Sequence, residues 1–268
     1  MTTSVDTFKL LAPELALVVA ALVALLGAAF AGLRSGWLVA LLGIAAAMAL
    51  AGGQPAAGAA IISGPITLDG FSSYIRWAVL VVGAILALVQ AGDLFRSAVT
   101  HGSGLSRGGT CEEAGTFLVL LAGLSLVGVA NDLVLLFVGL ELVSIPTYIL
   151  LALKRTDGNG QEASLKYFFL SLVASALFLY AAVCFYGIGG STSLTAIGQA
   201  LQASESGATV MATALLPIAL GMAMAGAAFR MAAVPMHFYA PDVYEGTSPG
   251  NAALLSTLPK RSEEHTSE

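Results

Sequence analysis

Four ionisable side chains, Glu141, Lys166, Arg230 and Lys260, lie in or beside apolar stretches of the sequence, where such groups are rare. Glu141 stands in FVGLELVSIPTYILL, Lys166 in EASLKYFFL and Arg230 in GMAMAGAAFRMAAVP. An ionisable group in the middle of a bilayer costs roughly 2.5–3.5 kcal/mol on insertion scales, so it needs a partner, water or a function. Because charged groups inside membranes mark proton and ion pathways, we take these residues as candidates for a proton path.

Glu141 occupies the middle of its apolar segment, beyond easy reach of either membrane surface. Pro146 follows in the same segment and lacks the N–H that would bond to the Leu142 carbonyl. We therefore expect a free backbone acceptor beside the carboxylate and a locally hydrated helix. The alternative is a structural carboxylate that is paired with a neighbouring helix.

Lys166 lies near the start of the next apolar segment, and Glu162 precedes it by one helical turn. This order of acid and base favours an ion pair along one helix. The lysine therefore either belongs to the proton path or extends its ammonium group to the membrane surface. The sequence leaves both interpretations open.

Arg230 ends a segment rich in glycine and methionine, and Pro235 and Pro241 interrupt any helix that follows. Interrupted helices hold ion sites in transporters, so the pattern favours a functional cation over a loop arginine at the membrane surface. His237, in the same segment, is either a proton relay that titrates near neutrality or a satisfied interfacial residue. Lys260 follows ALLSTLP and would lie in the membrane if the apolar stretch continued.

The composition is that of a membrane protein with several spans. Hydrophobic residues make up 57% of the 268 residues, charged residues only 10%, and the mean hydropathy is +0.89. A soluble domain carries roughly 25% charged residues, so a soluble enzyme is excluded. The Lys and Arg residues are scattered, which gives no basic face for nucleic acid. Cys111 and Cys184 lie far apart without a CxxC motif, which argues against a disulfide framework and against zinc or iron–sulfur sites.

Apolar helices must position these candidates. The long apolar runs have helical periodicity or none, and they predict an all-α polytopic membrane protein of about seven transmembrane helices plus the start of an eighth. No alternating pattern indicates a β-barrel. The expected spans lie near 14–33, 37–52, 75–92, 115–130, 133–153, 163–187 and 209–229, followed by an amphipathic piece at 231–240 and an apolar start at 249–259.

Basic residues in the loops indicate the orientation in the membrane. Loops 52–70 and 188–208 contain no Lys or Arg, and neither does the junction between the fourth and fifth spans. The positive-inside rule therefore predicts an N-terminus outside the cell. The basic loop residues are Arg34, Arg96, Arg107, Lys154 and Arg155, and the mild exceptions to the rule are Lys9 and Arg76.

The last residues, 261–268, read RSEEHTSE and are wholly polar after an apolar run. One reverse translation of this octapeptide matches a common short-read sequencing adapter. We therefore expect a non-native tail and a native chain that continues beyond Lys260. The alternative is a short polar tail at a membrane surface.

Three blocks of the sequence are similar to one protein family. They resemble the antiporter-like membrane subunits of respiratory complex I, above all subunit N of bacterial NADH:quinone oxidoreductase. The blocks are ANDLVLLFVGLELVSIPTYILLAL, EASLKYFFLSLVASALFLYA and FRMAAVPMHFYAPDVYEGTSPGNAALLSTLPK. The resemblance is most specific at 130–150 and 229–260 and weakest in the first three spans.

The resemblance implies a fourteen-helix fold, in which two inverted five-helix repeats each carry a half-channel and a broken helix. The chain is then the N-terminal half of this fold, truncated at its C-terminus. Residues 1–112 would hold three transmembrane helices, and residues 113–260 would hold the incomplete first repeat with a broken seventh span. Residues 261–268 would be the non-native tail.

The resemblance also implies roles for the candidates. Family members place a glutamate in the fifth span, here Glu141, opposite a lysine in the seventh span, where this sequence has Arg230. They place another lysine in the eighth span, here Lys260, and often one in the sixth, here Lys166. Arginine is effectively never deprotonated in proteins, so Arg230 is expected to bias the charge of Glu141 without releasing a proton.

The implied function is redox-coupled proton translocation in the membrane arm of NADH:quinone oxidoreductase, in a bacterial inner membrane. The subunit is expected to have no redox centre, while NADH, FMN, iron–sulfur clusters and quinone belong to the rest of the parent complex. Its expected partners are the other membrane-arm subunits and the lipid bilayer. The alternatives are a subunit of an Mrp-type cation/proton antiporter and a non-conducting membrane scaffold, although a mid-span Glu141 argues against the scaffold.

Overall fold

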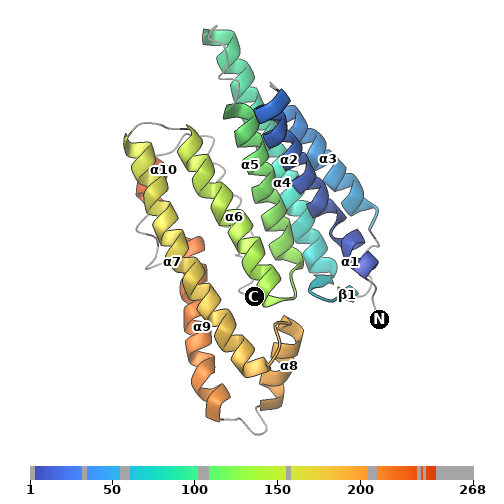
Figure 1. Ribbon diagram of the computed structural model, residues 1–268, viewed down its shortest axis with the longest axis vertical. Helices are drawn as coiled ribbons and strands as arrows, with labels where there is room; N and C mark the ends of the chain where they lie inside the picture. Colours follow the sequence, from blue (N-terminus) through green and yellow to red (C-terminus); the bar gives the residue numbers. More distant parts are fainter. Residues whose placement is uncertain are drawn as a thin grey trace.

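The computed structural model describes residues 4–31, 35–54, 61–101, 109–154, 158–204, 210–233, 237 and 240–245. Long apolar helices dominate this part of the chain, and each of them overlaps one predicted span (Figure 1). The all-α fold class predicted from the apolar runs is therefore confirmed. These helices are α2 (Ala12–Ala31), α3 (Gly36–Gly52), α4 (Gly70–His101), α5 (Gly109–Val129), α6 (Leu133–Lys154), α7 (Gly158–Gly189) and α9 (Val210–Arg230).

The two longest helices, α4 and α7, extend beyond the spans predicted for them. Both contain 32 residues, and polar residues continue each helix past its apolar stretch. Hydropathy reports the part of a helix that suits the membrane, so it underestimates helices whose ends continue into water. The predicted spans located these helices correctly and placed their ends too close together.

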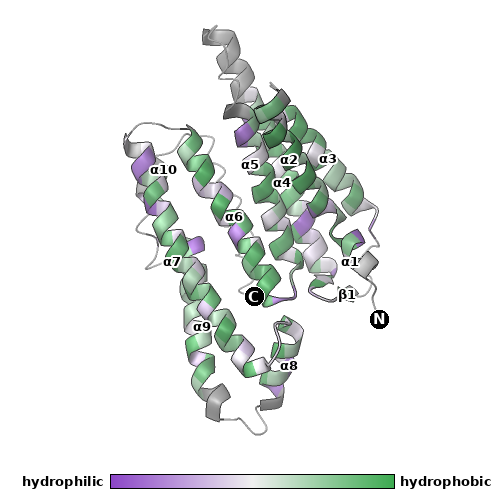
Figure 2. Ribbon diagram, viewed as in Figure 1, coloured by the Kyte–Doolittle hydropathy of each residue, from purple (hydrophilic) through white to green (hydrophobic). Residues whose placement is uncertain are grey.

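Within the described residues, five helices are long and apolar enough to cross a membrane, namely α2, α4, α5, α6 and α7. Shorter apolar helices are Gly36–Gly52 and Ala214–Arg230. Their surfaces expose large apolar side chains such as Phe30 and Met224, which are 87% and 71% exposed. Figure 2 shows hydrophobic residues along most of these helices. Exposed apolar surface of this extent is typical of contact with lipid.

Helix α5 is the most enclosed of these helices. Of its apolar window, 72% is buried, compared with 28% for α2 and for α7. Helices α2, α3 and α4 pack against it through a shared core that includes Leu17, Ile44, Leu80 and Phe117. Helix α6 packs against α5 as well, and α7 and α9 form a pair that continues the arrangement beyond α6 (Figure 1).

Short elements occur where only loops and the interrupted segment were predicted. Helix α8 (Leu194–Ser204) and the antiparallel strands β1 (Ile61–Ser63) and β2 (Ile66–Leu68) lie within two of the loops. The hairpin was not predicted, because three-residue strands are too short to leave an alternating pattern. Two further short helices are α1 (Ser4–Leu10) and α10 (Ala240–Glu245).

The turn between α5 and α6 is fixed by the hairpin and by α8. Asn131 donates its backbone N–H to the Pro65 carbonyl at 2.8 Å, and its side-chain oxygen accepts a hydrogen bond from Thr195 at 2.9 Å. The Asp132 carboxylate caps the start of α6 by accepting the N–H of Val134 at 2.9 Å. These contacts set the position at which α6 enters the bundle and hence the depth of its polar residues.

Candidate functional site

Glu141, Ser175 and Arg230 come together from three helices, α6, α7 and α9. The Ser175 hydroxyl donates a short hydrogen bond to Glu141 Oε1 and accepts one from Arg230 Nη2 at 3.1 Å. Arg230 Nη2 lies 3.4 Å from the same Glu141 oxygen, within ion-pair distance. A carboxylate, a hydroxyl and a guanidinium thus contact one another, and we call these three residues the Glu141 cluster.

Arg230 also donates hydrogen bonds to neutral oxygens of α6. Its Nη1 atom donates to the Leu140 carbonyl at 3.1 Å and to the Ser144 hydroxyl. The Ser144 hydroxyl itself donates to the Leu140 carbonyl at 3.0 Å. These acceptors do not depend on the charge of Glu141. Arg230 therefore keeps hydrogen-bond partners when the carboxylate takes up a proton.

Burial differs between the two charged groups of the cluster. The Arg230 side chain is 8% exposed, whereas the Glu141 side chain is 28% exposed. The Nε atom of Arg230 is buried and has no hydrogen-bond partner among the described residues. The cation is thus enclosed, while the carboxylate is only partly covered.

The close approach of α9 to α7 depends on Gly226. A Cβ at this position would lie 3.0 Å from the Ala174 carbonyl oxygen and 3.4 Å from Phe178 Cβ. Ala174 precedes Ser175, and Arg230 follows Gly226 by one turn of α9. The missing side chain therefore brings the guanidinium within reach of the serine hydroxyl.

Helix α9 ends directly after Arg230, as the prediction of an interrupted segment required. Ala233 donates its N–H to the Ala228 carbonyl at 2.8 Å, and Ala232 donates to the Phe229 carbonyl at 3.0 Å. This pair of bonds is the Schellman pattern of a helix C-terminus. Ala232 has a φ of 51°, a left-handed conformation that costs a non-glycine residue roughly 1–2 kcal/mol.

The predicted amphipathic piece at 231–240 does not form one helix. Residues 231–232 form a turn, and α10 begins at Ala240. Residues 234–236 and 238–239 lie outside the described part of the chain. Arg230 therefore stands at the boundary between a regular helix and an interrupted segment.

Pro146 does not break α6, which runs continuously from Leu133 to Lys154. The Leu142 carbonyl that the proline leaves without its usual partner packs against α5. A Cβ added at Gly123 of α5 would lie 2.9 Å from that oxygen and 2.7 Å from its carbon. A neighbouring helix thus covers the freed acceptor, and local hydration stays a prediction.

The other candidates lie elsewhere. Lys166 forms an ion pair with Glu162 at 2.8 Å, as their spacing predicted, and the two side chains are 42% and 64% exposed. His237 is exposed, between α9 and α10. Lys260 lies outside the described residues, as do the apolar start at 249–259 and the tail at 261–268.

Sequence reasoning did not identify Ser144 and Ser175 as site residues. Ser144 follows Glu141 by three positions and therefore shares its helix face, which was the available signal. Ser175 lies on a different helix, so its role depends on tertiary packing that no local pattern reveals. Within the described ranges, no group of three or more His, Cys, Asp or Glu side chains could hold a metal ion.

A second acid–base cluster was also missed. Glu14 and Arg76 form a buried ion pair at 2.9 Å, and Ser125 donates to the same carboxylate oxygen at 2.5 Å. Arg76 was interpreted only as an exception to the distribution of loop charges, and Glu14 was not considered. A carboxylate and a cation near the ends of two neighbouring apolar helices were the signal that could have found them.

The chain is similar to known membrane proteins. Residues 130–263 match a family described as "NADH:quinone oxidoreductase/Mrp antiporter, TM". The chain is 34% identical over 224 residues to NADH-quinone oxidoreductase subunit N of Anaeromyxobacter sp. (strain Fw109-5). The aligned region covers 81% of this chain and 41% of that protein. The chain thus spans about half the length, or less, of the curated relatives it matches.

Solved structures are similar as well. A chain of respiratory complex I from Thermus thermophilus, with bound aureothin, matches with a TM-score of 0.72 and 27% identity, over 94% of this chain and 51% of that one. A chain of the Mrp complex from Dietzia sp. DQ12-45-1b matches with a TM-score of 0.68 and 21% identity, over 94% of this chain and 27% of that one. The second match shows a common fold alone.

Proposed function

Because the chain belongs to the family of NADH:quinone oxidoreductase and Mrp antiporter transmembrane subunits, we propose that it takes part in redox-coupled proton translocation. The parent complex would be NADH:quinone oxidoreductase, for which relatives of this chain are named. The chain would act in the membrane arm, as a channel element without a redox centre of its own. Flavin, iron–sulfur clusters and quinone chemistry would belong to other subunits.

The Glu141 cluster is the observation that carries this proposal. A carboxylate inside an apolar helix is costly unless it has a partner or a function. Here it has a partner, Arg230, but the contact is long at 3.4 Å and the carboxylate is 28% exposed. A shorter contact would strengthen an ion pair whose role was structural alone. The arrangement therefore supports a carboxylate that changes its protonation state.

The chemistry follows from the two charged groups. Arg230 stays protonated and supplies a fixed positive charge at the end of α9. A nearby cation favours the carboxylate form of Glu141, and greater separation in a low-dielectric environment favours the neutral acid. A small movement of α9 away from α6 would let Glu141 bind a proton, and the return movement would release it.

The serines keep both states of the cluster satisfied. Ser175 donates its hydroxyl hydrogen to Glu141 Oε1, and its hydroxyl oxygen accepts a hydrogen bond from Arg230. The hydroxyl therefore bridges the carboxylate and the guanidinium. Ser144 and the Leu140 carbonyl continue to accept from Arg230 after Glu141 is neutralised. Lys166, in its exposed pair with Glu162, would lie at an aqueous end of the path. His237 and Lys260 are further candidates along it.

The test replaces Glu141 with Gln in the complete subunit within its membrane complex. This change keeps the size of the side chain and removes its ability to exchange a proton. NADH oxidation and proton transfer would be measured together in sealed vesicles with a pH-sensitive dye. We expect an assembled complex with lost proton transfer through this subunit, and normal proton yield per NADH oxidised would refute the proposal.

A subunit of an Mrp-type cation/proton antiporter is the second candidate. The family description names both kinds of protein, and the Dietzia Mrp chain shares the fold. The two candidates differ in their need for electron transfer. Proton transfer driven by a sodium gradient without NADH would favour the antiporter, and so would a gene neighbourhood of antiporter genes. A chain that conducts in neither assay would instead be a non-conducting scaffold.

The location and the partners belong to the same proposal. The chain would lie in a bacterial inner membrane, with its N-terminus outside and other membrane-arm subunits beside it. An N-terminal tag that reacts with an impermeant reagent in intact cells tests the orientation. Labelling only after the membrane is opened would place the N-terminus inside and reverse the assignment of the loops.

A further inference from the structure

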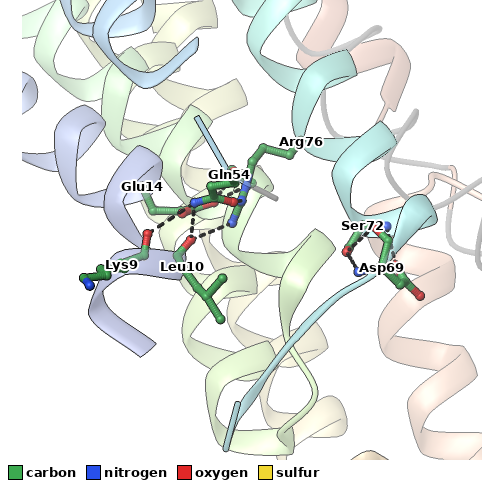
Figure 3. A network of polar contacts seen from close by, with 8 residues as sticks. Lys9, Leu10, Glu14, Gln54, Asp69, Ser72 and Arg76 are labelled. Carbon is green, nitrogen blue, oxygen red and sulfur yellow. Dashed lines mark hydrogen bonds and ion pairs between the residues drawn. The ribbon is translucent and has the colours of Figure 1, made fainter. Parts of the chain in front are cut away.

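Glu14, Arg76 and Ser125 form a second cluster, which joins the N-terminal helices to α5. Arg76 on α4 contacts Glu14 on α2 at 2.9 Å, and Ser125 on α5 donates to the same Glu14 oxygen at 2.5 Å. Arg76 also donates to Gln54 at 2.5 Å and to the Leu10 carbonyl at 3.2 Å. Figure 3 shows the arginine directed toward these partners. We call Glu14, Arg76 and Ser125 the Glu14 cluster.

The charges of this cluster are almost completely enclosed. The Arg76 side chain is 2% exposed and the Glu14 side chain 6% exposed. Glu14 Oε2 is buried and has no hydrogen-bond partner in the described part of the chain. The carboxylate therefore depends on the bonds that Arg76 and Ser125 make to its other oxygen. Buried charges of this kind tolerate little change in the position of their partners.

Helix α5 connects this cluster with Glu141. Ser125 lies two residues from Gly123, where an added Cβ would be 2.7 Å from the backbone carbon of Leu142 on α6. A Cβ added at Gly139 would lie 3.2 Å from a backbone nitrogen of α5. Glu141 stands between Gly139 and Leu142 in the sequence, so α5 contacts the backbone of α6 both before and after this residue. A shift of α5 along its axis would therefore displace Glu141.

We propose that the Glu14 cluster is a positioning element for proton transfer. Through the Ser125 hydroxyl it fixes the height of α5, and α5 in turn holds Glu141 opposite Ser175 and Arg230. The inference rests on the proposed function of Glu141. Neither Glu14 nor Arg76 transfers a proton in this role; their contact holds α2 and α4 against α5.

A purely local role for the cluster makes a different prediction. If the ion pair only joined α2 to α4, loss of the Ser125 hydroxyl would lower stability and leave the surroundings of Glu141 unchanged. A positioning role requires an effect at Glu141 itself. The two roles are therefore separated by a measurement that reports on that carboxylate.

The test uses Ser125→Ala in the complete subunit within its membrane complex. Its first readout is the proton yield per NADH oxidised, which should fall toward the value measured for Glu141→Gln. Its second readout is the infrared carboxyl band of Glu141, identified as the band that Glu141→Gln removes. This band should shift in Ser125→Ala. Glu14→Gln serves as a second variant and should shift the band in the same way.

Thr116→Val is the matched control, since Thr116 also lies on α5 and its hydroxyl donates to the Glu112 carbonyl of the same helix at 2.7 Å. It should change neither readout. An unshifted band and a normal proton yield in both Ser125→Ala and Glu14→Gln would overturn the inference. If Glu141→Gln itself pumps normally, the proposed function fails, and a band shift in Ser125→Ala would still support the coupling of the two clusters.

Discussion

The two clusters have the same chemistry and different surroundings. In each, a serine hydroxyl and an arginine nitrogen contact one oxygen of a glutamate. The Arg76–Glu14 distance is 2.9 Å, with side chains 2% and 6% exposed, and the Arg230–Glu141 distance is 3.4 Å, with side chains 8% and 28% exposed. Residue identity therefore does not distinguish the enclosed ion pair from the one that we propose changes its protonation state. Enclosure and contact distance differ between the two pairs.

Helix geometry explains the difference. Arg76 lies inside α4, among helices that share a core with the enclosed α5. Arg230 is the last residue of α9 and is followed by a turn. A residue at a helix end can follow a change in the adjoining segment, whereas a residue within a packed bundle moves only with the bundle. The Glu141 cluster is therefore the one that could respond to a neighbouring subunit.

The largest expected effect is that of Arg76→Met on stability. It leaves Glu14 as a buried charge without its cation, which should destabilise the protein by about 3–5 kcal/mol. The measurement is the loss of folded protein with rising denaturant or temperature in detergent. The double variant Glu14→Leu with Arg76→Met removes both charges and should recover much of this loss. A loss below about 1 kcal/mol in Arg76→Met would show that the pair is not enclosed in the way the exposures indicate.

Arg230→Met should have a smaller effect on stability and a larger one on function. Glu141 is partly exposed and keeps the Ser175 hydroxyl as a donor, so we expect a loss of about 1–2 kcal/mol. Proton transfer should be lost, because no fixed charge then acts on the carboxylate. Arg230→Lys keeps the charge and should keep activity. If Arg230→Met still transfers protons, the residue is only an anchor and the contrast between the clusters has no functional meaning.

The sequence predicted the helices better than it predicted the contacts between them. The apolar runs located all the long helices, because burial in a membrane needs long apolar stretches. The hairpin at 61–68 and helix α8 were not predicted, since short elements leave no clear periodicity. The interruption after Arg230 was expected from Pro235 and Pro241, yet the described end of α9 is formed by the Schellman bonds at Ala232.

The candidate site shows the same limit. Glu141 and Arg230 were recognised because an ionisable residue in an apolar run is conspicuous by itself. Their serine partners were not, because serine is common in membrane helices and its role depends on which helix lies opposite. Arg76 was interpreted only as an exception to the positive-inside rule and therefore not considered as a buried group. Tertiary packing decides these roles, and the sequence of one helix does not contain it.

Ala232→Gly tests whether the end of α9 is under strain. Glycine adopts the left-handed conformation of Ala232, with φ 51°, without a steric cost, so the variant should be more stable by about 0.5–1 kcal/mol. Gly221→Ala, at a position of the same helix with open space around it, is a matched control for the change in backbone entropy. An unchanged or lower stability in Ala232→Gly would mean that the helix end next to Arg230 stores no strain.

The smallest effect is expected at the third acid–base pair, Lys166 with Glu162. Both side chains exceed one third exposure, at 42% and 64%, although their distance of 2.8 Å is the shortest of the three pairs. Water screens an exposed pair, so Lys166→Ala should cost about 0.5 kcal/mol or less. A double-mutant cycle with Glu162→Gln would measure the coupling between the two residues.

Proton transfer in Lys166→Ala shows which property controls function. If the exposure of an ion pair determines its role in proton transfer, Lys166→Ala should slow proton uptake at the aqueous end of the path. It should leave the proton yield per NADH near normal, whereas Arg230→Met should abolish proton transfer. If the yield instead falls to the level of Glu141→Gln, then an exposed pair is as essential as the half-enclosed one. Burial would then identify only the fully enclosed Glu14 cluster as a fixed ion pair. The roles of the Glu141 and Lys166 pairs would depend on where each pair lies along the proton path.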